Sequence, residues 1–120
     1  MKIETIDYKS NDFAKEFIQS LHETGFVVIK NHTIRSELIN DVYNDWSIFF
    51  NSSEKNNYLF DYDKQDGYFP FKSENAKDYR EKDLKEFYHV YPGWGRYPKS
   101  VNKNALVMHK QLMTLGKILL

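Results

Sequence analysis

Imidazole side chains bind metal ions and transfer protons near neutral pH, so the histidines are the first candidates for chemistry. The chain has four, at His22, His32, His89 and His109. None of them belongs to a His-x-Asp, His-x-Glu or His-Glu-x-x-His pattern, which would direct two ligands at one metal ion. We therefore interpret the histidines as structural. His89 alone stays open, because it falls in a predicted strand among aromatic residues.

Carboxylates gather at Asp61, Asp63 and Asp66, in a polar segment that ends at Gly67. Their spacing matches only the first positions of a calcium-binding loop. The spacing fails afterwards, and no glutamate stands at the twelfth position, where such a loop needs a bidentate ligand. We expect this segment to be a solvated loop.

Two further kinds of catalytic pattern are missing from the sequence. There is no Gly-x-Ser-x-Gly motif for a nucleophilic serine, and Gly93-Trp94-Gly95 lacks the glycine spacing of a phosphate-binding loop. Lys85 and Glu86 form the one charged pair inside a predicted strand. A buried ion pair there would be costly unless it were well hydrogen-bonded. The residues by themselves indicate no catalytic constellation.

The composition bounds the class of protein. The 120 residues include 17 basic and 17 acidic side chains, a balance that gives no electrostatic argument for nucleic acid or an anionic membrane as partner. The absence of cysteine excludes disulfides and thiolate metal sites. No signal-peptide pattern or membrane-length apolar run occurs, so we expect a soluble, cytoplasmic protein. Aromatic residues make 17% of the chain. They predict either a core whose edge is partly exposed to solvent or the wall of a pocket.

The first half of the chain predicts two helices around a strand. Apolar residues recur at helical spacing over residues 12–23, and Gly25 is placed to end that helix. Residues 26–29 form an unbroken apolar run, which predicts a strand covered on both faces. Thr33 is a candidate cap for a second helix that reaches Phe50. Asn51, with Glu54 three residues later, is a candidate cap for a short helix over 52–58.

The second half predicts an extended segment at 68–71, a surface loop at 72–82 and a strand at 84–91 with two mixed faces. A last helix would begin at Asn102 or Asn104. It would present Ala105, Met108, Leu112, Leu115 and Leu119 on one face. The helical pattern still continues at Leu120, and no glycine, asparagine or proline signal follows it, so we expect the chain to be a fragment whose C-terminal continuation is missing.

Four segments in order resemble the N-terminal region of the isopenicillin N synthase-like 2-oxoglutarate- and iron(II)-dependent oxygenases. The first is the helix end followed by Gly25–His32, although Thr33 replaces the usual glycine. The others are Gly67–Phe69, then Glu74–Ala76 with Asp83–Val90, and the turn at Pro92–Trp94 before a long helix. The resemblance covers almost the whole chain.

The resemblance implies an α+β fold: the helical and strand portion that precedes a double-stranded β-helix (jelly-roll) core. Residues 1–120 would be a single, incomplete domain of an enzyme that hydroxylates, desaturates or cyclises a small organic substrate. That enzyme would use Fe(II) and 2-oxoglutarate, held by residues downstream, so this segment alone would be inactive, with no catalytic, cofactor-binding or metal-binding residue. The resemblance places Tyr68, Phe69 and Tyr88 near the substrate pocket.

An alternative interpretation is a stand-alone, non-enzymatic α+β binding module. Its aromatic face, between Tyr68 and Tyr97, would bind a small ligand or a peptide. The aromatic excess and the lack of metal ligands in the sequence favour it. Neither interpretation involves nucleic acid or a membrane as partner.

Overall fold

The computed structural model describes residues 2–71 and 84–120. The predicted surface loop at 72–82, and the family-like residues Glu74–Ala76 and Asp83, lie outside the described residues. The chain divides into two compact units, Met1–Arg35 and Ser36–Leu120, each of which is described by itself. Helices and strands are mixed in both, as the sequence predicts.

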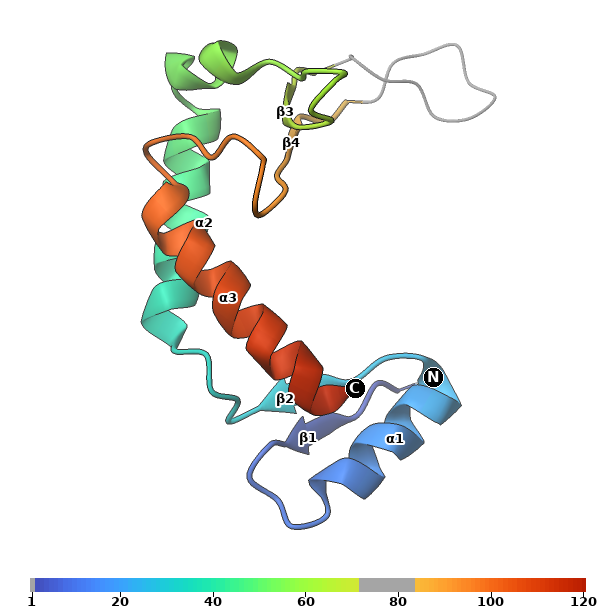
Figure 1. Cartoon of the computed structure of the whole chain (residues 1–120). Coiled ribbons are helices and arrows are strands. Elements are labelled where there is room, and N and C mark those ends of the chain that lie inside the picture. Colours follow the sequence, from blue (N-terminus) through green and yellow to red (C-terminus); the bar gives the residue numbers. More distant parts are fainter. Residues whose placement is uncertain (1, 72–83) are drawn as a thin grey trace, which may run out of the picture. The chain divides into compact units, whose positions relative to one another are not determined.

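The first unit is a strand–helix–strand motif, drawn in blue and cyan in Figure 1. It contains β1 (Thr5–Asp7), α1 (Phe13–Thr24) and β2 (Val28–Lys30). The two strands pair in parallel, with Ile6 opposite Ile29. Parallel neighbours need a crossover between them, and α1 provides it. Ile6 is 4% exposed and forms the centre of this small core.

The end of α1 is held by several hydrogen bonds. Gly25 has φ of +76°, and its N–H donates to the Leu21 carbonyl, which is how a glycine ends a helix. Ser20 is buried and donates its hydroxyl to the Phe26 carbonyl at 2.7 Å, and Thr24 donates to the same carbonyl at 2.9 Å. The predicted helix and its stop are confirmed.

The strand after this corner differs from the prediction. It is Val28–Lys30 instead of residues 26–29, and it is not covered on both faces. Phe26 is 63% exposed and Val28 is 51% exposed. The unit has two strands and one helix, so a single layer covers the sheet from one side. An unbroken apolar run indicates a strand, but it does not say how many layers of the same unit pack on it.

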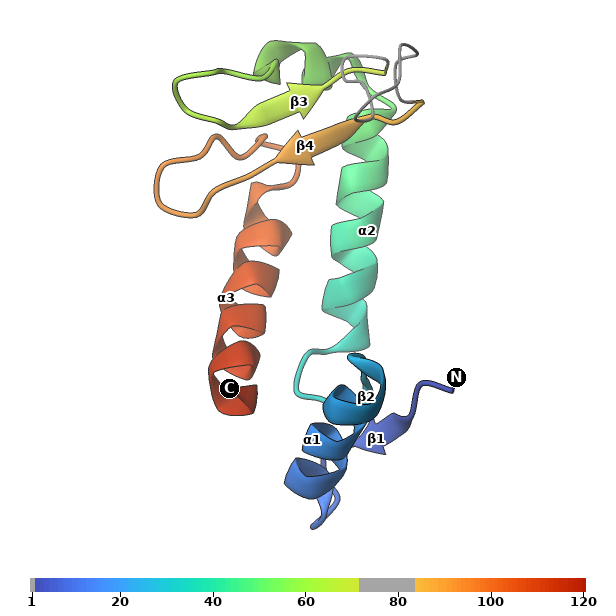
Figure 2. The same cartoon turned by 90° about the vertical axis from the view of Figure 1, so that its right-hand side faces the viewer.

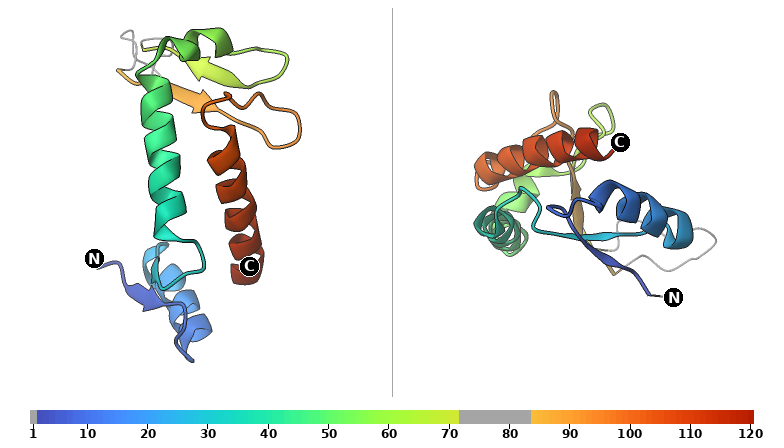
Figure 3. Two further views of the ribbon diagram at one scale, coloured as in Figure 1. Left: turned by 90° about the vertical axis from the view of Figure 1, so that its left-hand side faces the viewer. Right: turned by 90° about the horizontal axis from the view of Figure 1, so that it is seen from below.

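The second unit is a pair of long helices with a hairpin at one end. Figures 1 and 2 show α2 and α3 side by side, and Figure 3 shows the same pair from two other directions. Along the chain the elements are α2 (Ser36–Phe50), the 3₁₀ helix η1 (Ser53–Tyr58), β3 (Gly67–Phe69), β4 (Phe87–His89) and α3 (Asn102–Leu119). Strands β3 and β4 are antiparallel.

Three predicted helix caps are wrong. Helix α2 begins at Ser36 and not beside Thr33. Ser52, not Asn51, caps η1, and its hydroxyl accepts the Glu54 N–H at 3.2 Å. Val101 occupies the cap position of α3, because Asn104 is used between helices, where its amide donates to Asp45 at 2.8 Å. Several polar residues near each helix start can cap it, and tertiary partners decide which one does.

The core of the second unit is aromatic. Phe49 of α2 is fully buried, and its ring meets Trp46 and Tyr88 edge-on, each at 5.5 Å between centroids. Val101, just before α3, is 1% exposed. Of the predicted apolar face of α3, four residues are half-buried, but Leu112 is 51% exposed. Within the described residues, no helix combines the length and apolar character needed to cross a membrane.

Candidate functional site

The hairpin of β3 and β4 organises the candidate site. Tyr68 lies opposite Tyr88, and Phe69 lies opposite Phe87. Because side chains alternate across a strand, the two tyrosines share one face of the hairpin and the two phenylalanines share the other. The predicted strand at 84–91 is shorter, Phe87–His89, but the predicted alternation of its faces is confirmed.

The tyrosine face packs on α2. The ring of Tyr88 lies 5.3 Å from that of Trp46, and its hydroxyl donates to the Arg96 carbonyl. Burial raises the pKa of Tyr88, so its hydroxyl stays a neutral donor. Tyr68 is 3% exposed, with its ring 6.2 Å from that of Phe50. Both rings therefore anchor the hairpin to the helix.

A charged network joins the hairpin to η1. Lys55 Nζ lies 3.1 Å from Glu86 Oε2, and the same carboxylate oxygen accepts the Tyr68 hydroxyl at 2.5 Å. Lys55 also donates to the Phe50 carbonyl at 2.7 Å. The hydrogen bond to Glu86 raises the pKa of Lys55. The network explains how a half-buried charge is tolerated beside the strand: Glu86 is paired with a residue distant in sequence.

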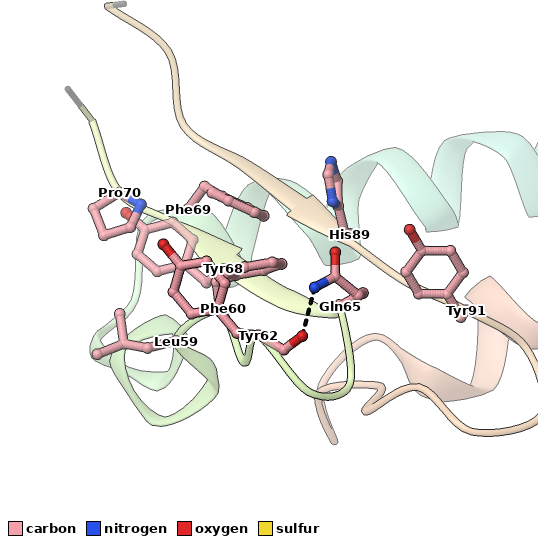
Figure 4. A pocket seen from close by; sticks show the side chains of 9 residues that line it. All are labelled: Leu59, Phe60, Tyr62, Gln65, Tyr68, Phe69, Pro70, His89 and Tyr91. Carbon is pink, nitrogen blue, oxygen red and sulfur yellow. Dashed lines mark hydrogen bonds between the residues drawn. The ribbon is translucent and has the colours of Figure 1, made fainter. Parts of the chain in front are cut away.

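The phenylalanine face borders a cavity of about 590 Å³, shown in Figure 4. The ring of Phe69 lies between those of Phe60, at 4.2 Å, and Phe87, at 4.4 Å, the latter stacked at 13°. His89 continues this wall, 4.8 Å from Phe69. The described residues that line the cavity are Leu59, Phe60, Tyr62, Gln65, Tyr68, Phe69, Pro70, His89 and Tyr91. A volume of this size fits a small organic molecule.

A buried ion pair holds the turn that borders the cavity. Asp66 is fully buried, and its carboxylate accepts from Arg96 Nε at 3.0 Å and pairs with Arg96 Nη2 at 2.9 Å. Arg96 Nη2 also donates to the Leu59 carbonyl at 2.8 Å. Burial alone raises the pKa of Asp66, but the hydrogen bonds and charge of Arg96 outweigh it, and the net pKa is lowered.

The expectation of a solvated loop at Asp61–Gly67 is therefore wrong for Asp66. Asp63 is exposed, as expected, whereas Asp66 points inward to a guanidinium thirty residues later in the chain. Nothing in the local sequence distinguishes the two carboxylates. A buried carboxylate needs such a partner, and only the folded chain supplies it.

The structure separates the three predicted pocket residues. Tyr68 and Phe69 belong to the lining of the large cavity. Tyr88 is not part of that lining and borders a second cavity of about 260 Å³, together with Trp46, Phe50, Glu86 and Phe87. Gln65 and His89 lie in the large cavity without having been predicted there. The position of His89 in a strand among aromatics was the one available signal; Gln65 gave none.

The described residues offer no metal site: no group of three or more His, Asp or Glu side chains among them is placed to hold an ion. The candidate site is thus an aromatic cavity with a few polar atoms on a helix-supported hairpin. This arrangement can bind and orient a ligand.

The fold and the site together define a class of protein, an α+β region that carries an aromatic cavity. A family model described as "non-haem dioxygenase in morphine synthesis N-terminal" matches residues 3–110. The chain therefore belongs to the family of non-haem dioxygenase N-terminal regions, which confirms the resemblance read from the sequence.

One solved structure is similar over the full chain. It is the crystal structure named "Putative oxygenase from Shewanella oneidensis", with 47% sequence identity and a TM-score of 0.87. The match covers 100% of this chain and 41% of that chain, so this chain spans less than half the length of its relative. No curated protein matches the sequence.

Proposed function

We propose that this chain is the N-terminal part of an Fe(II)- and 2-oxoglutarate-dependent oxygenase that hydroxylates, desaturates or cyclises a small organic substrate. The observation that carries the proposal is family membership over residues 3–110. The greater length of the similar oxygenase supports a longer protein, in which a jelly-roll core would follow this region.

Within that enzyme, the hairpin side chains would contact the substrate. The rings of Phe69 and Phe60 give an apolar wall, and Tyr68 belongs to the same lining. Tyr88 shares the tyrosine face with Tyr68 but lies outside the lining, and its role would be to fix the hairpin on α2. Orientation of a substrate by such fixed groups lowers the barrier to reaction, because the reacting atoms are held together.

Iron and 2-oxoglutarate would supply the oxidising chemistry when bound. The described residues do not fit an iron site, since no three suitable ligands meet among them. The proposal therefore assigns no metal ligand to this chain. Its residues bind the substrate, orient it and exclude water from it.

A thermal-shift measurement on the full-length protein tests this proposal. Fe(II) added anaerobically with 2-oxoglutarate should raise the Tm, because both would bind the folded state alone. Mg(II) with 2-oxoglutarate and Fe(II) with succinate are the controls, and both should raise it less. If Fe(II) with 2-oxoglutarate shifts the Tm no more than these controls do, the oxygenase proposal fails.

The second candidate is a binding module without enzymatic activity. The observation that favours it is the aromatic cavity, which lies among residues that offer no metal site. This candidate predicts no response to Fe(II) with 2-oxoglutarate, together with binding of a ligand in the cavity. The same thermal-shift measurement therefore separates the two candidates.

A further inference from the structure

The walls of the large cavity favour a flat ligand. Phe60, Phe69 and His89 of the lining form a continuous series of rings, with centroids 4.2 Å apart between Phe60 and Phe69 and 4.8 Å apart between Phe69 and His89. Tyr62 meets Phe60 edge-on at 5.1 Å, and Tyr91 borders the cavity from the other side. An aromatic ligand gains about two- to tenfold in affinity per ring contact beyond the area it buries, and an aliphatic ligand of equal size lacks this gain.

The lining also indicates that the ligand is neutral. Among the residues that the structure describes, the lining includes no lysine, arginine, aspartate or glutamate. The charged groups that pack behind the lining are paired, Asp66 with Arg96 and Glu86 with Lys55. Asp63 and Lys64, in the turn, are exposed to solvent. An ionised ligand entering this cavity would lose water without meeting a formal charge of opposite sign, which is unfavourable.

Gln65 supplies a hydrogen-bond acceptor for a ligand in the cavity. Its backbone has φ of +58°, an uncommon conformation for a residue with a side chain, and its N–H donates to the Asp61 carbonyl at 2.7 Å. Its side-chain amide nitrogen donates to the Tyr62 carbonyl. That bond fixes which end of the amide is oxygen, and Figure 4 shows the oxygen turned away from Tyr62. The carbonyl end therefore offers an acceptor to the cavity.

From these three features we infer that the cavity binds a neutral aromatic ligand with a hydrogen-bond donor on its ring, of which a phenol is the simplest example. The ring packs against the aromatic side chains of the lining, Phe60, Phe69 and His89, and the donor meets Gln65 Oε1. The inference deepens the proposed function by naming a substrate class, and in calling the ligand a substrate it rests on that function.

Calorimetric titration of the full-length protein tests the ligand class with three probes of similar size. They are 4-ethylphenol, ethylbenzene, which lacks the donor, and 4-ethylcyclohexanol, which lacks the aromatic ring. We expect 4-ethylphenol to bind about fivefold more tightly than either of the others. Equal affinity for the three probes, or no saturable binding of 4-ethylphenol at millimolar concentration, would overturn the inference.

A Gln65→Asn variant tests the polar contact. Asparagine tolerates positive φ, so the turn keeps its shape while the carbonyl is withdrawn by one methylene. The affinity for 4-ethylphenol should fall about tenfold, with that for ethylbenzene unchanged. Asp63→Asn, in the same turn and outside the lining, is the matched control and should change neither. Unchanged 4-ethylphenol affinity in Gln65→Asn would contradict the assignment.

The failure of this inference can be told from failure of the proposed function, because the readouts are independent. A Tm response to Fe(II) with 2-oxoglutarate but no binding of 4-ethylphenol would leave the oxygenase and remove the phenol site. Selective phenol binding without the Tm response would leave the site and remove the oxygenase.

Discussion

Asp66 and Arg96 form the contact on which the cavity turn depends most. The carboxylate is fully buried and accepts both the side chain and the backbone N–H of Arg96. Arg96 in turn reaches the Leu59 carbonyl before the turn. Burying a carboxylate is unfavourable unless a cation and several donors replace its water, and here they do.

Replacement of Asp66 by asparagine should therefore be strongly destabilising. The variant leaves the Arg96 guanidinium, 28% exposed, beside a neutral amide. We expect the free energy of unfolding, measured in urea, to fall by about 3 kcal/mol. Asp63→Asn, at an exposed position of the same turn, should change it by less than about 0.5 kcal/mol. If both variants lowered the free energy of unfolding by similar amounts, the effect would come from the charge of the turn in general and not from the buried Asp66–Arg96 pair.

At the scale of the elements, β3 begins where the backbone has no room for a side chain. Gly67 has φ of +117°, and a Cβ there would lie 2.6 Å from the Tyr58 carbonyl oxygen and 2.7 Å from Arg96 Nη2. The close approach brings η1, β3 and the Asp66 ion pair together. A larger residue at this position has to displace backbone, which is more costly than moving a side chain.

A matched pair of glycine substitutions tests this packing. Gly67→Ala should lower the free energy of unfolding by about 2–3 kcal/mol, since it adds both strain and a clash. Gly116→Ala, in helix α3, adds a Cβ in open space and should raise it by about 0.5–1 kcal/mol. Thermal unfolding of both variants measures the difference. The idea fails if Gly67→Ala is as stable as the parent chain.

The junction of η1 with the hairpin depends on Glu86, which is shared by Lys55 and Tyr68. Tyr68→Phe keeps the ring on α2 but removes the hydroxyl donor. The free energy of unfolding should fall by about 1 kcal/mol. Tyr43→Phe, on an exposed ring of α2, should leave it unchanged. An equal effect of the two would show that the Glu86 contact adds nothing.

At the scale of the whole molecule, each unit carries one carboxylate with a lowered pKa among the residues that the structure describes. In the second unit it is Asp66. In the first it is Asp7, whose pKa is lowered by the Lys9 backbone N–H and by the side chain of Asn31. A lowered pKa means that the folded state favours the ionised form of the carboxylate. Each of the two aspartates therefore stabilises the fold fully above its unfolded pKa, and this stabilisation disappears as the pH falls through its folded pKa.

The whole chain should accordingly lose stability in acid, below the ordinary aspartate pKa of 3.8. Unfolding in urea at pH 7 and at pH 3 measures this. The stability difference between the parent chain and Asp66→Asn should shrink at pH 3, because below the unfolded pKa of 3.8 the unfolded chain binds a proton at Asp66 and the ionised, paired form of the folded chain loses part of its advantage. A difference that is the same at both pH values would contradict the linkage.

Local pattern was enough to predict the helices and the family. The stripe of Phe13, Phe17 and Leu21, and the stop at Gly25, correspond to α1 almost residue for residue. Helical periodicity and glycine conformation depend on only a few neighbouring residues, so the sequence alone is enough to predict them. The alternation of side chains between the two faces of β4 could be predicted for the same reason.

The folded chain decided the features that join distant residues. Asp66 with Arg96, Lys55 with Glu86, and the meeting of Gln65 with His89 at one cavity each connect residues more than twenty positions apart. Burial of a polar group depends on what packs over it, and a sequence pattern carries no information on packing at such separation. The aromatic composition of the sequence therefore predicted the walls of the cavity. The polar atoms of the cavity and the ion pair that supports it could be identified only from the tertiary structure.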